Sequence, residues 1–325
     1  MADLASKHSL VVLDDYQNSS ASFADWSAIP DLAVTTLNDP IPPSQLVDVL
    51  KPFTIVHAMR ERTKLPRSVL EQLPNLRFIT TTGLRNRAID LVAAKELGIV
   101  VSGTARPGGD PSVGTVEQTW ALILALSRRI RQEHESVRSG RWQTGLATGL
   151  AGKQLGLVGV GRLGSQVAAV GKAFGMSVVG WSPNLTEERA QQAGVKLAAS
   201  LEDLLSISDV VSLHLVLAES TKGLLGAKEL ALLKPEAFLV NTSRGPLIDE
   251  AALLDTLRSG AIRGAGLDVF DQEPLPVNHP LRTMDNVVLS PHMGYVETPL
   301  YQLWWEQTVE NVQAFLAGQH VRVLE

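Results

Sequence analysis

Short apolar segments alternate with amphipathic segments along the whole chain. Segments with helical spacing, such as SQLVDVLK and AIDLVAAKELG, separate apolar runs of strand length. In the first part of the chain the predicted strands are Leu10–Leu13, Ala33–Leu37, Thr54–Ala58, Leu76–Thr80 and Ile99–Val101. This alternation favours an α/β fold with a parallel sheet that helices cover on both faces.

The segment GTARPGGDPSVG, from Gly103 to Gly114, interrupts the alternation. It holds four glycines and two prolines, and we interpret it as a linker or hinge. The next segment, Val116–Val137, is predicted to form one long helix. Its middle, WALILALS, is apolar on every side, which is typical of a helix that is buried all round. The core of a domain and a subunit interface would each bury it, and the pattern does not decide between them.

The later part of the chain repeats the alternation of strands and helices. Its predicted strands lie within QLGLVGV, MSVVGW, DVVSLHL, AFLVN, GAGLDVF and NVVLS. We therefore expect a second doubly wound parallel sheet. The chain ends in an aromatic-rich helical segment, PLYQLWWEQTVENVQAFLAG, whose Trp304 and Trp305 are predicted core residues.

Length and composition fit a globular protein of two domains. The 325 residues are 45% hydrophobic and 19% charged, which allows a large core. The formal net charge is −5 and there is no basic tail, so nucleic acid is not an expected partner. The lack of cysteine excludes disulfides and thiolate metal sites. No apolar run reaches the roughly 18 residues of a membrane span and the N-terminus has no signal-peptide pattern, so we expect a soluble cytoplasmic protein without a membrane partner.

The segment LGLVGVGRLGSQ indicates a dinucleotide site. Gly159, Gly161 and Gly164 have the spacing G-x-G-x-x-G, directly after an apolar strand and at the start of a helix. In dinucleotide-binding folds the first glycine permits a tight turn, the second lets the backbone approach the pyrophosphate, and the third lets the helix pack on the strand. The helix N-terminus then favours the anion. Arg162 and Leu163 of the same loop are expected cofactor contacts.

The ribose end of this predicted site lacks its usual acid. An Asp or Glu that bonds the ribose hydroxyls is expected about 20 residues further on, at the end of the next strand. That place reads GWSPN, so Ser182 stands where an acid would repel a 2′-phosphate. Asn184 could donate a hydrogen bond to a phosphate, although no arginine lies in the short loop after Trp181. We therefore expect an NAD(P) site with weak discrimination, in which NADPH is used at least comparably to NADH.

Three polar residues follow successive predicted strands of the second sheet. Arg244 follows AFLVNTS, Glu273 follows GLDVFDQ and His292 follows NVVLSP. Ligands of open α/β sheets bind beyond the carboxyl ends of the strands, so these side chains are expected to converge near the cofactor. A guanidinium at the end of a buried strand also requires an anionic partner. The motifs G-x-S-x-G and H-E-x-x-H are absent, so a hydrolase of that type or a zinc enzyme is not indicated.

Two longer segments give these residues a family context. NTSRGPLIDEAALLDTLRSGAIRGAGLDVFDQEPLP and SPHMG resemble the signature segments of the D-isomer-specific 2-hydroxyacid dehydrogenases, and the likeness covers nearly the whole chain. The resemblance implies a Rossmann dinucleotide-binding domain, residues 106–294, inserted into a flavodoxin-like substrate domain, residues 1–105 and 295–325. It also implies a homodimer built on the long helix after residue 115.

The family pattern implies roles for individual residues. Arg244 matches the arginine that binds the substrate carboxylate and carbonyl, Glu273 the acid that pairs with the catalytic histidine, and His292 the proton donor and acceptor. Asp268 matches the residue that faces the nicotinamide carboxamide. The remaining expected contacts are His214 and Thr242 for the cofactor, and Thr82, Gly83 and Leu84, whose loop backbone meets the substrate carboxylate.

The chain departs from the family pattern at two places. Val216 stands where family members usually have proline. The loop Leu84–Arg85–Asn86–Arg87 replaces the commoner Gly-Tyr-Asp-Asn, which leaves the identity of the substrate open. Arg85 and Arg87 could favour a second anionic group on the substrate or could simply be solvated.

Together these residues predict an oxidoreductase that transfers a hydride between NAD(P)H and a small 2-oxo acid or D-2-hydroxy acid. Arg244 can hold a 2-oxo acid through two parallel N–H···O bonds, and His292, paired with Glu273, can deliver a proton to the ketone oxygen. The formate dehydrogenases that resemble this chain have Gln in the place of Glu273. An alternative is a dinucleotide-sensing scaffold, like the corepressors that resemble the family, since such a scaffold can retain the same residues.

Overall fold

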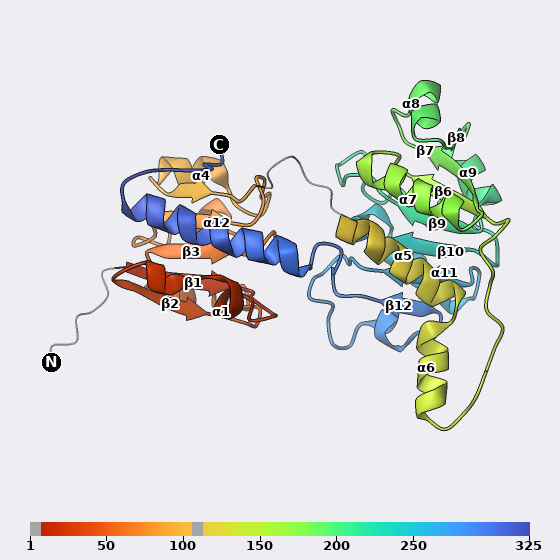
Figure 1. Ribbon diagram of the computed structural model, residues 1–325, viewed down its shortest axis with the longest axis horizontal. Helices are drawn as coiled ribbons and strands as arrows, with labels where there is room; N and C mark the ends of the chain where they lie inside the picture. Colours follow the sequence, from red (N-terminus) through yellow and green to blue (C-terminus); the bar gives the residue numbers. More distant parts are fainter. Residues whose placement is uncertain (1–7, 106–112) are drawn as a thin grey trace. The chain divides into compact units, whose positions relative to one another are not determined.

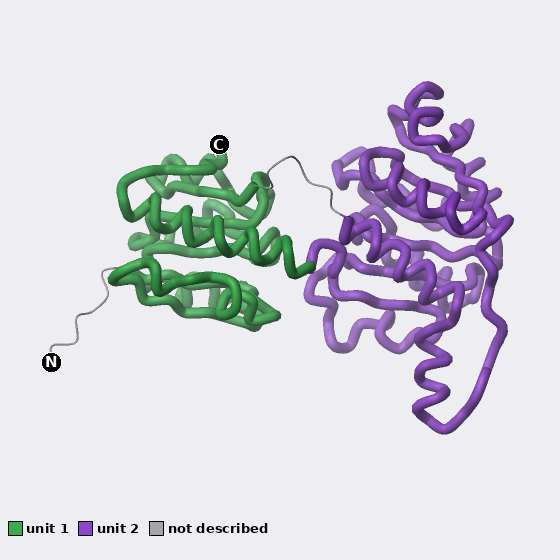
Figure 2. Tube along the Cα trace, viewed as in Figure 1, with its two compact units in different colours: residues 1–110, 297–325 green, residues 111–296 purple. Residues whose placement is uncertain are grey.

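The computed structural model describes residues 8–105 and 113–325, which fall into two compact units (Figure 2). Unit 1 comprises Met1–Asp110 and Glu297–Glu325, and unit 2 comprises Pro111–Val296. The chain therefore passes from unit 1 to unit 2 and back. Part of the predicted linker, residues 106–112, lies outside the described residues. Within the described ranges no helix combines the length and the apolar composition that crossing a membrane requires.

Unit 1 is built on one parallel sheet (Figure 1). Its elements are β1 (His8–Leu13), α1 (Ser20–Phe23), η1 (Trp26–Ala28), β2 (Leu32–Thr36), α2 (Leu46–Leu50), β3 (Ile55–Ala58), α3 (Arg67–Leu70), β4 (Phe78–Thr81), α4 (Leu91–Glu96), β5 (Val100–Ser102) and α12 (Thr298–Leu316). The strands pair in the order β2-β1-β3-β4-β5, which is the 2-1-3-4-5 order of flavodoxin-like folds. The first sheet predicted from the sequence is confirmed, with strand ends shifted by one or two residues.

Helix α12 returns from unit 2 and closes the core of unit 1. Trp304 and Trp305 are both buried, and the ring of Trp305 lies 4.6 Å from the ring of His57 on β3. Gln307 of the same helix makes two hydrogen bonds of 2.7 Å with the backbone of Ala105, one to its N–H and one to its carbonyl. The point where the chain leaves unit 1 is thereby tied to the helix on which it returns.

His57 is an unusual residue for this core. Both of its ring nitrogens are buried, and neither has a hydrogen-bond partner among the residues that the structure describes. Burial lowers the pKa of His57 to about 3, although the nearby Asp15 carboxylate acts in the opposite direction. The imidazole is therefore neutral at ordinary pH, and it packs as an aromatic ring.

Unit 2 is built on a larger parallel sheet. Its elements are α5 (Val113–Ser127), α6 (Ile130–Arg138), β6 (Gln154–Val158), α7 (Arg162–Ala173), β7 (Ser177–Trp181), α8 (Glu187–Gln192), β8 (Lys196–Leu197), α9 (Leu201–Ile207), β9 (Val210–Leu213), α10 (Ala227–Leu230), β10 (Phe238–Asn241), η2 (Gly245–Leu247), α11 (Glu250–Arg258), β11 (Gly264–Leu267), η3 (Pro280–Thr283) and β12 (Val287–Leu289). The strand order is β12-β11-β10-β9-β6-β7-β8. The direction of winding reverses between β6 and β9, and such a switch point is where doubly wound sheets bind ligands. The predicted second sheet is confirmed, and β8 is an addition to it.

The predicted continuous helix over Val116–Val137 is wrong. The structure has two helices, α5 and α6, with a break at Arg128 and Arg129. Arg129 has a left-handed φ of +57°, which is uncommon for a residue other than glycine. The N–H of Thr148, from the loop that follows α6, bonds the carbonyl of Ser127 at 2.7 Å. No glycine or proline marks the break, and the bond from Thr148 occupies the Ser127 carbonyl that a continuous helix would use.

Helix α5 is also not buried on every side within the single chain. Trp120 and Ile123 are buried and face the sheet and α7, whereas Ala121 is exposed and Leu124 and Ala125 are half-buried. The core of unit 2 therefore covers one side of the helix and leaves an apolar strip on the other.

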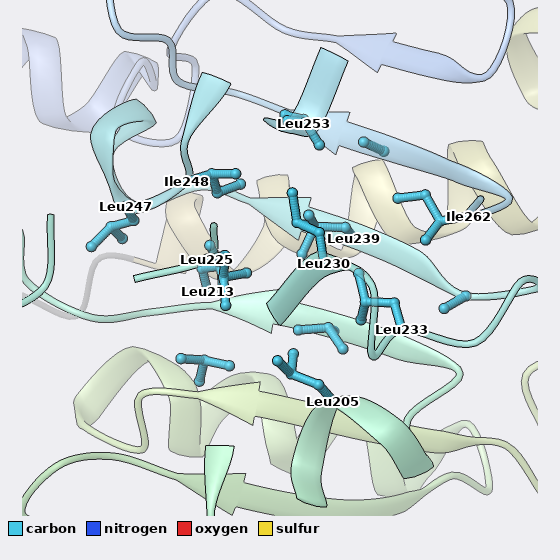
Figure 3. Close-up of a cluster of buried hydrophobic side chains, with 14 of the residues drawn as sticks. Leu205, Leu213, Leu225, Leu230, Leu233, Leu239, Leu247, Ile248, Leu253 and Ile262 are labelled. Carbon is cyan, nitrogen blue, oxygen red and sulfur yellow. The ribbon is translucent and has the colours of Figure 1, made fainter. Parts of the chain in front are cut away.

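A cluster of buried aliphatic side chains anchors the loop that follows β10. Leu247 and Ile248 lie among the buried residues Leu213, Leu225 and Leu239 (Figure 3). The N–H of Leu225 also bonds the carbonyl of Leu247 at 3.1 Å. The backbone just beyond the end of β10 is thus fixed by the core rather than left as a free loop.

Candidate active site

In the glycine loop after β6, a side chain would clash with the neighbouring backbone at Gly159 and Gly164 but not at Gly161. A Cβ at Gly159, whose φ is +108°, would lie 2.6 Å from the carbonyl carbon of His214, and a Cβ at Gly164 would overlap the Gly159 oxygen. A Cβ at Gly161 would meet no atom within 4 Å. Gly161 is the N-cap of α7, so this open space lies where free N–H groups and the helix dipole favour an anion. The loop therefore fits the pyrophosphate of a dinucleotide, with the exposed Arg162 at the first turn of the helix.

The end of β7 is joined to this loop. Ser182 Oγ accepts a hydrogen bond from the N–H of Val160 at 3.0 Å. Asn184 is exposed, and its carbonyl accepts a bond from Nη1 of Arg189 at 3.2 Å. The sequence shows no arginine in this loop, but Arg189 reaches back to it from the first turn of α8, because helical side chains point toward the helix N-terminus. The sequence places Arg189 about a turn into the helix, so it was not counted as a cation for the phosphate, and the bond to Asn184 makes it a candidate.

Three further predicted cofactor contacts are packed within unit 2. Leu163 is half-buried against the core. The ring of His214 lies 2.9 Å from Ser212 Oγ, and burial lowers the pKa of His214 to about 4, so this imidazole is neutral at ordinary pH. Thr242 Oγ1 lies 2.8 Å from Thr119 Oγ1 of α5. The His214 backbone borders the glycine loop, whereas the Thr242 hydroxyl faces α5.

Arg244 follows β10 on a turn that Asn241 folds. The side chain of Asn241 donates to the carbonyl of Arg244 at 2.8 Å and accepts from the N–H of Ser243 at 3.0 Å. The half-buried guanidinium of Arg244 donates to the carbonyl of Ser243 at 2.7 Å. The strand thus ends in a turn with little freedom, and the cation keeps a defined place at the sheet edge.

Gly245 brings this turn against the loop that follows β11. A Cβ at Gly245 would overlap the backbone of Phe270 and Asp271, so only glycine allows the approach. Glu273 lies in the same loop, and the charge of Arg244 acts on its carboxylate. Gly245 was not singled out from the sequence, although a glycine directly after a candidate catalytic arginine is the signal that could have found it.

Glu273 and His292 form a hydrogen-bonded pair. Oε2 of Glu273 lies 2.7 Å from Nδ1 of His292, and Oε1 accepts the N–H of Phe270 at 2.9 Å. Burial alone would raise the pKa of the Glu273 carboxyl, but His292, the Phe270 N–H and the charge of Arg244 together bring it below its ordinary value. The ring of Tyr295 packs edge-on against His292 at 5.2 Å. Glu273 is therefore ionised at neutral pH and directed at the histidine.

Asp268 holds the turn that carries His292. Its carboxylate accepts the N–H groups of Met293 at 2.8 Å and Gly294 at 2.9 Å, and its carbonyl accepts the N–H of His292 at 2.7 Å. Burial raises the pKa of Asp268, while the bonds from Ser290, Met293 and Gly294 and the charge of His292 act to lower it. Within unit 2 this side chain therefore bonds the turn, and it also accepts a bond from Nε2 of Gln118 on α5 at 3.3 Å.

The chain is similar to a known protein family and to several characterised proteins. A family model described as the D-isomer specific 2-hydroxyacid dehydrogenase, NAD binding domain, matches residues 120–294. The chain belongs to this family. Family membership and the relatives below support oxidoreductase activity on 2-hydroxy or 2-oxo acids with a nicotinamide dinucleotide.

Two relatives and one solved structure place the chain within the family. A glyoxylate reductase from Aeropyrum pernix is 42% identical over 260 residues, which cover 77% of this chain and 76% of that protein. A D-3-phosphoglycerate dehydrogenase from Methanocaldococcus jannaschii is 38% identical over 277 residues, 85% of this chain but only 52% of that protein. The structure of a phosphoglycerate oxidoreductase from Vibrio cholerae o395 has a TM-score of 0.89 and 34% identity, and the match covers 96% of this chain and 99% of that one.

In unit 1 of this dehydrogenase family member, the predicted substrate loop follows β4. The N–H of Gly83 donates to Thr104 Oγ1 at 2.8 Å, and Thr82 Oγ1 accepts the N–H of Arg60 at 2.9 Å. Nη1 of Arg60 donates to the Thr82 carbonyl at 3.3 Å. Leu84 is 53% exposed, and its N–H has no hydrogen bond within the described ranges. Of the three predicted residues, Thr82 and Gly83 use these groups to hold the loop, and Leu84 presents a backbone donor.

Proposed function

We propose that this family member is a reductase that uses NAD(P)H to reduce a small 2-oxo acid, and that oxidises the matching D-2-hydroxy acid in the reverse direction. The observation that carries the proposal is the Glu273–His292 pair at 2.7 Å, with the Arg244 turn on the adjacent strand end. Carbonyl reduction needs a proton for the ketone oxygen and a cation for the carboxylate. These three side chains offer both at one edge of the sheet.

In the proposed mechanism the nicotinamide, when bound, supplies the hydride. Nδ1 of His292 bonds Glu273, which leaves Nε2 to face the ketone oxygen and give it a proton. Arg244 binds the substrate carboxylate through paired N–H···O bonds and polarises the ketone as negative charge develops. In the oxidative direction the neutral His292 takes the proton back.

The loop of unit 1 contributes a backbone donor in this proposal. The resemblance assigned Thr82, Gly83 and Leu84 jointly to the substrate carboxylate. Because the Gly83 N–H is already bonded to Thr104, we assign the contact to the N–H of Leu84. Thr82 and Gly83 then act by holding the loop in shape.

The proposed cofactor preference rests on the loop after β7. Ser182 carries no charge that would repel a 2′-phosphate, and its Oγ is engaged with the N–H of Val160. Arg189 lies against the carbonyl of Asn184 in the same loop and can supply the cation that a phosphate needs. We therefore propose that NADPH serves at least as well as NADH.

The substrate class is tested by turnover on a panel of 2-oxo acids. The relatives are named glyoxylate reductase and phosphoglycerate dehydrogenase, so we propose glyoxylate, hydroxypyruvate and pyruvate as first probes. Oxidation of NADPH or NADH that depends on one of these acids, and formation of the D-hydroxy acid, is the expected result. The two cofactors are compared at the same acid concentration.

The alternative function is a dinucleotide-sensing scaffold, and the same assay separates it from the enzyme. A scaffold would bind NADPH tightly and change its assembly state while turning over none of the acids. Binding is measured from the fluorescence of the reduced nicotinamide, and assembly from sedimentation. Tight binding without turnover on the whole panel would replace the enzyme proposal by the scaffold.

We further propose that the chain forms a homodimer through α5 and the segment that follows it. Figure 1 shows α6 and the loop after it extending away from the body of unit 2. Trp142 and Leu146 of this loop are 76% and 89% exposed, and Ile130 and Val137 of α6 are more than half exposed. Large apolar side chains gathered on one projecting segment are typical of a surface that another chain covers.

A further inference from the structure

Two side chains of helix α5 form hydrogen bonds with the turn that carries His292, one at each end of the turn. Gln118 Nε2 donates to Ser290 Oγ at 2.7 Å and to Oδ1 of Asp268 at 3.3 Å. One helical turn earlier, Thr115 Oγ1 donates to the carbonyl of Gly294 at 2.8 Å. The helix packs across β10, β11 and β12, so it is a rigid support for the strand ends that carry the site.

The turn needs such support because of its backbone. His292 has a left-handed φ of +56°, a conformation that is unfavourable for a residue other than glycine. The conformation is kept by bonds from outside the turn, among them those of the Asp268 carboxylate to Met293 and Gly294. Whatever fixes Asp268 therefore fixes the backbone from which the His292 ring projects.

We propose that Gln118 is a positioning residue for His292. Gln118 acts by orienting the Ser290 hydroxyl toward Asp268 and by donating directly to the Asp268 carboxylate. The inference rests on the proposed role of His292 as the proton donor. Gln118 is not a conspicuous candidate in the sequence, where it stands in the polar start of a helix that is otherwise apolar. Its effect on the reaction is exerted through the turn.

The direction of the hydrogen bonds makes the role specific. An amide nitrogen can only donate, so the bond from Gln118 uses a lone pair of the Ser290 oxygen and leaves the hydroxyl proton for another acceptor. Asp268 is that acceptor, since a side-chain bond from Ser290 acts on its carboxylate. A carboxylate in place of Gln118 would accept the hydroxyl proton instead and would take this donor away from Asp268.

The test compares Gln118→Glu, Gln118→Leu, Ser290→Ala and the combination of the last two. We expect each variant to slow hydride transfer to glyoxylate, measured in single turnovers with NADPH, about tenfold, which corresponds to roughly 1.4 kcal/mol. The KM for glyoxylate and the Kd for NADPH should change by less than about threefold, or roughly 0.7 kcal/mol. The variant that combines Gln118→Leu and Ser290→Ala should also lose about tenfold in the hydride-transfer rate. Independent effects would multiply to about a hundredfold, but both changes break the same chain of bonds.

Gln132→Leu is the matched control. Gln132 lies in the same unit and donates from Nε2 to the carbonyl of Asp285 at 3.0 Å. Asp285 precedes β12, whereas the His292 turn follows that strand. Its loss should leave the hydride-transfer rate unchanged. Melting temperatures are measured for all variants, and if Gln118→Leu folds poorly the test rests on Gln118→Glu and Ser290→Ala.

Two outcomes would overturn the inference, and a third would overturn its basis. A wild-type rate in Gln118→Glu shows that donation from this position is not needed. A loss that follows the melting temperature, or that appears in KM and rate alike, shows a purely structural role. An active His292→Asn variant, or a wild type without activity on any acid of the panel, refutes the proposed function itself. An inactive His292→Asn beside normal Gln118 variants refutes the positioning role alone.

Discussion

Oε2 of Glu273 lies 2.7 Å from Nδ1 of His292, and this single contact determines which ring nitrogen is available for chemistry. When the imidazole is neutral, a carboxylate at Nδ1 holds the proton there and leaves Nε2 as an acceptor. When the imidazole is charged, Nε2 carries the second proton. The pair can therefore release a proton in one direction of the reaction and accept one in the other from the same atom.

His292→Ala is expected to lower kcat for oxo-acid reduction by about 100- to 10,000-fold, because proton transfer belongs to the transition state. The KM should change far less. Glu273→Gln keeps the size and the hydrogen bond but removes the charge, so its loss should be smaller than that of His292→Ala. Steady-state kinetics of both variants, together with a pH profile of the wild type, check this. A flat profile between about pH 5 and 9 with hydride transfer rate-limiting would exclude His292 as the acid.

Arg244→Ala is expected to remove most activity while dinucleotide affinity stays nearly intact. Loss of one partner of a desolvated charge pair costs roughly 2–5 kcal/mol. At roughly 1.4 kcal/mol per decade, kcat/KM should fall by about 30- to 4,000-fold. Arg244→Lys keeps the charge without the paired geometry, so its kcat/KM should lie between that of the wild type and that of Arg244→Ala. A fall of less than about threefold in Arg244→Ala, roughly 0.7 kcal/mol, contradicts the assignment.

The cofactor loop is tested by Ser182→Asp and Arg189→Ala. An introduced carboxylate can accept the same N–H of Val160 that Ser182 accepts, and it would repel a 2′-phosphate. We expect the ratio of kcat/KM for NADPH over NADH to fall by a factor of about ten or more, or roughly 1.4 kcal/mol. Arg189→Ala should lower the NADPH value and leave the NADH value unchanged. Arg138→Ala, an exposed arginine on α6, is the control. A wild type that prefers NADH about a hundredfold would show that another group binds the ribose.

The buried His57 should make the free energy of unfolding of unit 1 sensitive to acid. Its pKa is about 3 in the folded protein against an ordinary value of 6.5, so the unfolded chain takes up the proton first. The free energy of unfolding is therefore highest above pH 6.5 and falls as the pH drops toward 3. At about 1.4 kcal/mol per pH unit, the loss at pH 5 is about 2 kcal/mol.

His57→Leu should remove this part of the pH dependence. Urea unfolding followed by tryptophan fluorescence at pH 7 and pH 5 measures it, since Trp305 packs on the ring. His320→Gln, at an exposed histidine of the same unit, is the control. The idea fails if the variant and the wild type lose equal stability between the two pH values.

The proposed dimer depends on the apolar segment after α6. Trp142→Ser combined with Leu146→Ser should shift sedimentation from dimer to monomer at micromolar concentration, because large apolar side chains dominate such interfaces. Val277→Ser changes a side chain that is 91% exposed elsewhere on unit 2 and is the control. A wild type that sediments as a monomer would refute the proposal directly.

Much of the fold could be predicted because its signals are local. Apolar runs of strand length mark almost every strand, and the spacing of Gly159, Gly161 and Gly164 marks the loop after β6. The grouping of Arg244 and Glu273 with His292 also follows from the sequence, since each lies in the loop that follows a strand of a parallel sheet. In such a sheet all carboxyl ends lie on one edge, and β10, β11 and β12 are neighbours.

The contacts that the sequence did not reveal join residues far apart in the chain. Gln118 meets Ser290, and Thr104 takes the N–H that Gly83 was expected to offer. The break at Arg129 likewise coincides with a bond between Ser127 and Thr148. Single polar residues of this kind have no periodicity or spacing of their own. Their partners are set only when the helices and strands pack.

Hydrogen bonds close to the two ends of unit 2 bear on whether this unit can be exchanged. Thr115 bonds Gly294, so the first and last segments of unit 2 lie side by side, and Gln307 bonds Ala105 where unit 1 is interrupted. Insertion and exchange of a segment are tolerated best where its ends are close together. We therefore expect that residues 113–296 can be exchanged as one segment. The corresponding cofactor-binding unit of a relative could then be inserted at the same position without longer connecting segments.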